Sequence, residues 1–242
     1  MAPAAVLAAS ALALAPAGPA GATINTTSQA GYQVGGPGHW SFRYIRAEFT
    51  VPQHACSSDD FNRAGIQLAG KVDSVAVGVA CQGSTPTAGY QFGYNGTTWS
   101  NTWTFTTKAL SDDLILASLY YDQGNNYVSM QETDLTTGQT LVNDTSLAYG
   151  AMYHWATALA QVNTPLVFAP NPGQSFVLVP FSKVGVTTYN GTHGKGGGMT
   201  GPWTMTGLRA VNGAHADFAP RPLFSSEGGQ YNTFNTREYG NS

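Results

Sequence analysis

The stretch that decides the fold is "YGAMYHWATALAQ", residues 149–161, which contains enough Ala, Leu and Met to suggest a helix. In it Tyr153, Trp155 and Thr157 alternate with other residues, a period of two that is typical of a β-strand. Alanine favours a helix at this spacing. However, a preceding glycine and a following Asn-Thr-Pro bound the stretch as they bound a strand. We therefore predict a strand here, with His154 on the face opposite Trp155.

Hydrophobic residues follow the same period of two along most of the chain. It is seen in "SFRYIRAEFTV" (41–51), "DLILASLYYD" (113–122), "NYVSMQETDL" (126–135) and "SFVLVPFSKVGVTTYN" (175–190). The intervening "YDQGNN" and "TDLTTGQT" have the composition of hairpin turns. Many short strands separated by turns predict an all-β domain, either an antiparallel sandwich or a barrel. No repeat, linker or change of composition follows residue 30, so we predict a single domain.

The composition excludes several functions. Charged residues make up 10% of the 242, against roughly 25% in an average globular protein. A hydrophobic content of 42% excludes a disordered chain, and a net charge of −3 without a basic run excludes a nucleic-acid partner. The histidines are scattered and show no metal-ligand spacing, so we expect neither a metal nor a cofactor.

Residues 1–22, "MAPAAVLAASALALAPAGPAGA", have the character of a signal peptide. About ten apolar residues precede a run of small residues suited to cleavage. Pro16 and Pro19 interrupt the apolar run, which is too short for a span of roughly 20 residues, so we expect no membrane anchor. We predict a secreted protein whose folded domain occupies residues 31–242.

The chain contains two cysteines, Cys56 and Cys81. An even count in an oxidising compartment predicts a single disulfide, and two free buried thiols are the alternative. Closing the loop between them would stabilise the fold by roughly 3 kcal/mol in the chain-entropy model.

Seven blocks of the sequence fall in the order in which similar blocks occur in the glutamic peptidases, also called eqolisins. They are "AEFTVP" (47–52), "AGIQLAG" (64–70), "DSVAVGVAC" (73–81), "SMQETDLTTGQT" (129–140), "HWATALAQ" (154–161), "FVLVPFSKVGVTTYNG" (176–191) and "GLRAVNGAHADFAPRPLFSSEGGQYNTF" (207–234). Their shared order carries the resemblance. It implies a concanavalin-like sandwich of two bent antiparallel sheets, with a substrate groove across the concave sheet.

The resemblance also implies a catalytic pair, a glutamate and a glutamine facing that groove. The carboxylate serves as general base to the attacking water and then as acid to the leaving amine. The glutamine amide orients the water and donates to the developing oxyanion.

This sequence departs from the family at both positions. When the blocks are aligned on Gly78, the family's glutamine position falls on Ala76. When they are aligned on Trp155, the family's glutamate position falls on His154 and that of a second glutamate falls on Ala158. A further acidic position of the family falls on Gln91. A methyl group cannot donate to an oxyanion, and losing one such donor costs about 10²–10³ in rate.

We therefore expect a groove that has kept its shape and lost ordinary Gln/Glu peptidase catalysis. The residues expected to line it for binding are Gln67, Tyr90, Phe92, Tyr94 and Trp155. The expected ligand is an extended peptide or glycan, bound by a secreted monomer.

Two alternative functions remain at the level of the sequence. In the first, His154 is itself the general base of a hydrolase, with Gln91 or Gln67 as its polar partner, since imidazole titrates near neutral pH. In the second, the sandwich is a carbohydrate-binding or carbohydrate-cleaving module. "QETD" places Glu132 and Asp134 on one strand face, and glycosidases need two carboxylates.

Overall fold

The computed structural model describes residues 23–26, 29–35, 40–52, 56, 61–71, 73–94, 103–148, 153–162, 179–194, 198–212, 216–220, 224–225 and 232–239. Regular structure within these ranges consists of β-strands. No helix among them has the length and apolar character needed to cross a membrane. The predicted signal segment, 1–22, lies outside the described residues, as does the side chain of Tyr94.

The strands, in chain order, are β1 (Thr23–Thr26), β2 (Gln29–Gly35), β3 (Phe42–Thr50), β4 (Phe61–Gly70), β5 (Asp73–Gln82), β6 (Thr85–Tyr94), β7 (Thr104–Lys108), β8 (Leu114–Asp122), β9 (Tyr127–Asp134), β10 (Thr140–Leu147), β11 (Tyr153–Val162), β12 (Val179–Thr188), β13 (Thr204–Asn212), β14 (Ala216–Pro220), β15 (Phe224–Ser225) and β16 (Asn232–Tyr239). Residues 153–161 of the ambiguous stretch lie in β11, which confirms the strand prediction there, and residues 149–152 lie outside the described residues. The two expected hairpins join β8 to β9 and β9 to β10.

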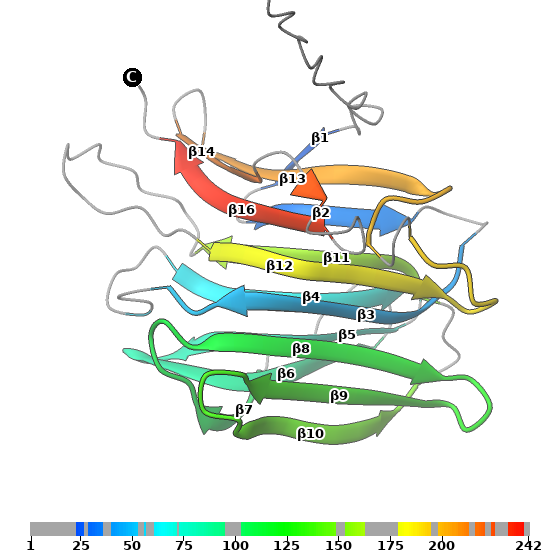
Figure 1. Cartoon of the computed structure of the whole chain (residues 1–242), viewed down its shortest axis with the longest axis horizontal. Coiled ribbons are helices and arrows are strands. Elements are labelled where there is room, and N and C mark those ends of the chain that lie inside the picture. Colours follow the sequence, from blue (N-terminus) through cyan, green and yellow to red (C-terminus); the bar gives the residue numbers. More distant parts are fainter. Residues whose placement is uncertain are drawn as a thin grey trace, which may run out of the picture.

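Hydrogen bonding connects the strands in the order β10-β9-β8-β3-β12-β16-β14-β13-β2-β11-β4-β5-β6-β7, with β1 beside β13 and β15 beside β16. Neighbours are antiparallel, except that β1 runs parallel to β13. The path folds back on itself around β14, so that its two halves stack as two layers (Figure 1). We call the half formed by β13, β2, β11, β4, β5, β6 and β7 the site sheet, and the half formed by β16, β12, β3, β8, β9 and β10 the second sheet. The predicted antiparallel β-sandwich is confirmed.

The core lies between these two sheets. Alternate residues of β3, such as Ile45 and Phe49, and of β5, such as Val75 and Val77, are fully buried there. Contacts of β3 with β4 and of β8 with β4 and β5 join the layers. Burying a side chain of this size stabilises the fold by about 1.5–3 kcal/mol, so the alternation fixes which face of each strand points inward.

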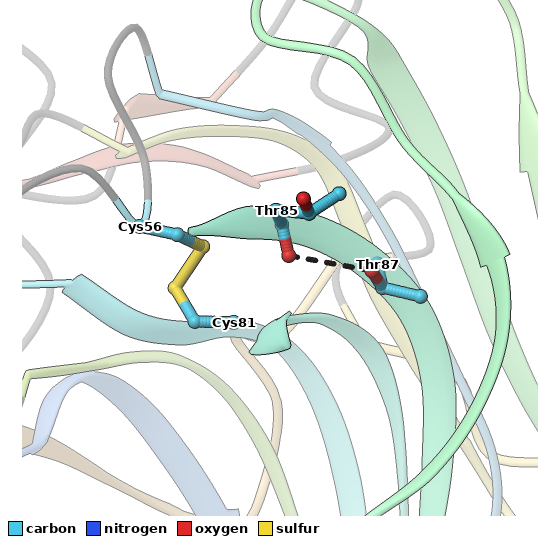
Figure 2. The surroundings of a disulfide bond; sticks show 4 residues. All are labelled: Cys56, Cys81, Thr85 and Thr87. Atoms are coloured by element: carbon cyan, nitrogen blue, oxygen red, sulfur yellow. Dashed lines mark hydrogen bonds between the residues drawn. A yellow bond between two sulfur atoms is a disulfide. The ribbon is translucent and has the colours of Figure 1, made fainter. Parts of the chain in front are cut away.

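The predicted disulfide joins Cys56 to Cys81, with Cα atoms 5.3 Å apart (Figure 2). It ties the loop before β4 to the end of β5. In the following hairpin, the Thr87 hydroxyl donates to the Thr85 carbonyl oxygen at 3.3 Å. No free cysteine remains, because these two are the cysteines of the whole sequence.

Candidate functional site

The candidate site lies on the outer face of the site sheet, the face turned away from the core. Because side chains alternate along a strand, burial of Ile66 and Leu68 in the core places Gln67 of β4 on the outer face. The antiparallel register then assigns its cross-strand neighbours to the same face. Gln67 lies opposite Ala76 of β5 on one side and Thr157 of β11 on the other.

This register extends to a row of five residues across five strands. From β2 to β6 the row is Gln33, Thr157, Gln67, Ala76 and Gln91. The Gln33 amide donates to the Thr157 hydroxyl at 3.3 Å. Thr157, Ala76 and Gln91 are buried although they face away from the core, whereas Gln33 and Gln67 are half-buried. We call this set the amide row, and it offers both donors and acceptors of hydrogen bonds.

Arg63 of β4 stands beside the row on the same face. Its Nη1 donates to Gln91 Oε1 at 2.7 Å, and its guanidinium carbon lies 5.6 Å from the centre of the Trp103 ring. Burial lowers the pKa of Arg63 to about 10, which leaves it charged at neutral pH. The Trp103 indole Nε1 is buried and has no hydrogen-bond partner in the described part of the chain.

Two glycines let β4 and β5 approach each other closely next to the amide row. Gly65 of β4 and Gly78 of β5 lie opposite each other. A Cβ on Gly65 would lie 2.2 Å from the Val77 carbonyl oxygen, and one on Gly78 would lie 2.1 Å from that of Ala64, so neither position tolerates a side chain. Beside Gly65 the outer face has a small depression that is open to solvent. It is lined by Arg63, Ala64, Gly65, Ile66, Gln67, Ala76, Val77, Trp103 and Leu159.

His154 does not stand in the amide row. Tyr153 pairs with Gly70 and Trp155 with Ala69, so His154 is the extra residue of a β-bulge. Its Nδ1 donates to the Trp40 carbonyl oxygen at 2.9 Å, and its ring lies edge-on to Trp155, with centres 5.8 Å apart. The outward residue of β11 in line with Gln67, Ala76 and Gln91 is Thr157. Nothing in the described structure joins His154 to either glutamine, and its correspondence to the family glutamate stays a prediction.

The groove aromatics expected from the sequence divide between the two faces. Trp155 lies on the outer face, opposite Ala69 and Gly35. Tyr90 and Phe92 pack against the core instead, because they alternate with Gln91, which faces outward. Tyr90 hydrogen-bonds to Asp144 of the second sheet, which raises the pKa of its phenol. Their assignment to the groove is therefore corrected.

The carboxylates suggested for glycoside chemistry also face inward. Glu132 is fully buried between the sheets, and Asp134 accepts hydrogen bonds from Thr136 and Thr137 in the β9–β10 turn. Neither carboxylate faces the amide row. The carbohydrate-cleaving alternative thus lacks its acid pair at this site.

Acidic residues are almost absent from the site sheet. Among all its strands the sequence places one, Asp73, at the start of β5. Asp73 is buried on the core side, where it accepts a hydrogen bond of 3.2 Å from the Tyr153 hydroxyl. The described residues also contain no cluster of His, Cys, Asp and Glu able to hold a metal ion. The amide row therefore has hydrogen-bonding groups and a cation beside it, but no carboxylate from the strands of the site sheet faces it.

Sequence reasoning missed Arg63 and Thr157 as members of the site. The signal for Arg63 was present, because in "NRAGIQLAG" it lies four residues before Gln67 and so on the same strand face. Its contacts with Gln91 and Trp103 depend on pairing between strands distant in sequence.

Models of known protein families give no match to this chain, and curated protein sequences give none either. Solved structures do match. A scytalido-glutamic peptidase bound to a transition state analog inhibitor aligns over 69% of this chain and 82% of its own, at 17% identity and a TM-score of 0.50. A member of the eqolisin family of peptidases, in a complex with the tripeptide Ala-Ile-His, aligns over 70% and 83%, at 16% identity and a TM-score of 0.50. The β-sandwich of this chain therefore has the fold of the glutamic peptidases.

Proposed function

We propose that this chain is a secreted peptide-binding protein with a glutamic-peptidase fold that does not perform Gln/Glu acid-peptidase catalysis. One observation carries the proposal. The sheet that bears the amide row contains a single acidic residue in its strands, and that residue is buried on the opposite face. A carboxylate base for water attack is thus missing from the strands on this face, while the polar groups for binding are present.

An extended peptide suits the chemistry of this face. Side-chain amides such as Gln67 donate to peptide carbonyls and accept from peptide N–H groups. Gly65, which carries no side chain, lines the depression beside the amide row. The two similar structures hold, respectively, a transition state analog inhibitor and a tripeptide. The disulfide suits an oxidising, extracellular compartment.

His154 is the weaker candidate for a surviving base. Its Nδ1–H donates to the Trp40 carbonyl oxygen, which leaves Nε2 as the basic nitrogen, but the residue lies in the bulge and outside the amide row. A hydrolase built on His154 would need its substrate at the bulge rather than at the depression.

Binding is tested with the tripeptide Ala-Ile-His as probe. We expect saturable binding by calorimetry. In Gln67→Ala the affinity should be about 2- to 10-fold weaker, because one hydrogen bond to the peptide is lost. Gln131→Ala is the matched control, because Gln131 is exposed on β9 of the second sheet and should leave affinity unchanged. Absence of binding at millimolar peptide, or an equal loss in both variants, would contradict the proposal.

A further inference from the structure

Arg63 is a half-buried cation without a described anion. It lies on the outer face of β4, and none of the described carboxylates lies within ion-pair distance of it. Burial lowers its pKa, as expected when a charge loses water without gaining an opposite charge. A cation that is shielded from water without an opposite charge costs free energy, which a bound anion would offset.

The guanidinium is held in place by its neighbours. Gln91 accepts one N–H at 2.7 Å, and the Trp103 ring lies against it. A guanidinium carries several N–H donors in a planar fork, and the described residues accept from one of its nitrogens, Nη1. The remaining edge is pre-organised for a planar partner that accepts two parallel hydrogen bonds.

The small depression next to Arg63 is open to solvent, so a partner can approach the guanidinium from outside. Arg63, Gly65, Gln67 and Trp103 all line it, and the buried Trp103 N–H in its wall is a donor without an acceptor among the described groups. Cationic and neutral donors, with no carboxylate of the described residues in ion-pair contact, form a site for an anion.

We propose that Arg63 binds a carboxylate of the ligand, and that Gln91 and Trp103 position its guanidinium for this. The inference rests on the proposed peptide-binding function and adds to it a specificity for an acidic group. Two sources would supply this chemistry: the free C-terminus of a peptide or an Asp or Glu side chain.

Two pairs of probes separate these sources. Ala-Ile-His is compared with its C-terminal amide, and N-acetyl-Ala-Glu-Ala-amide with N-acetyl-Ala-Gln-Ala-amide. We expect the acidic member of at least one pair to bind about 10- to 100-fold more tightly, the range for a charge-assisted hydrogen bond. The pair that shows the difference identifies the source. Equal affinities within both pairs would overturn the inference while leaving peptide binding intact, and no binding by any probe would overturn the proposed function as well.

Variants assign the effect to Arg63. In Arg63→Gln we expect the acidic and neutral probes to bind alike, with the neutral probes unchanged within about twofold. Arg63→Lys keeps the charge but loses the fork, so it should retain part of the difference. Lys71→Gln is the control, since it removes a positive charge from the exposed turn after the same strand. A loss of discrimination in Lys71→Gln equal to that in Arg63→Gln would contradict a specific site.

The pH dependence gives a test that needs no variant, should Arg63→Gln fail to fold. The discrimination should vanish as the pH falls below about 4, where the ligand carboxyl gains a proton. Binding of the amide probes should not follow that titration. Discrimination that persists at pH 2 would rule out recognition of a carboxylate.

Discussion

Replacing Glu132 with leucine should raise the free energy of unfolding by about 1–4 kcal/mol at pH 7, although it changes a fully buried residue. Glu132 points between the sheets, and neither carboxyl oxygen has a hydrogen-bond partner of good geometry among the described residues. Burial raises the pKa of Glu132 well above its usual value, and the nearby Gly89 backbone amide offsets this in part. Leucine is similar in volume and carries no charge to desolvate.

The effect should grow with pH. Below about pH 4 the carboxyl is protonated in both states. As the pH rises, the unfolded chain releases this proton and the folded chain keeps it. The free energy of unfolding of the unmodified protein then falls by about 1.4 kcal/mol per pH unit, until the pH reaches the raised pKa of Glu132 in the folded state. Urea unfolding followed by tryptophan fluorescence from pH 3 to 8 should show the variant's advantage widening over that interval.

Glu48→Leu is the matched control, with the opposite expected sign. Glu48 is also almost fully buried, but Lys183 lies 3.0 Å and Arg46 3.6 Å from its Oε1. Replacing it removes a carboxylate that these cations compensate, and with it both ion pairs, which should destabilise the fold. Should Glu132→Leu instead lower stability at pH 7, as is expected of Glu48→Leu, that result would contradict the interpretation that Glu132 is buried without a hydrogen-bond partner.

The double variant Cys56→Ser, Cys81→Ser should lose about 3 kcal/mol of stability, because the unfolded chain regains the freedom of an open loop. Urea unfolding measures this loss. Reducing agent should produce a similar loss in the unmodified protein and none in the variant. Thiol titration of the denatured, unreduced protein should find no free thiol; two reactive thiols would contradict the bond.

A strand within residues 149–161 and the β-sandwich can both be predicted from the sequence, because both follow from the local alternation of apolar and polar side chains. The bulge in β11 is different. Tyr153, His154 and Trp155 all suit a strand, and the extra residue becomes visible only from the pairing with Gly70 and Ala69. A bulge shifts the outward face by one residue, so the member of the amide row on this strand is Thr157.

The faces on which the expected groove aromatics lie could have been predicted from the sequence. If Gln91 faces the groove, its neighbours Tyr90 and Phe92 must face the core, and this alternation is readable from the sequence itself. The site around Arg63 is less accessible to such reasoning. Gln91 lies two strands away and Trp103 lies beyond another strand, so their meeting depends on long-range pairing that no local pattern encodes.

The function proposed above combines the fold of the glutamic peptidases and a peptide-binding face with no acid-peptidase turnover. The most direct test is incubation of the purified protein with a denatured protein substrate from pH 2 to 8, with peptide products detected by mass spectrometry and His154→Ala run in parallel. We predict no cleavage by either protein at any pH, with Ala-Ile-His still bound. Cleavage that appears above about pH 6, where imidazole is neutral, and is lost in His154→Ala would make His154 the base. Robust cleavage at pH 2–4 would contradict the account, because it would require a working carboxylate that the strands of the site sheet do not supply.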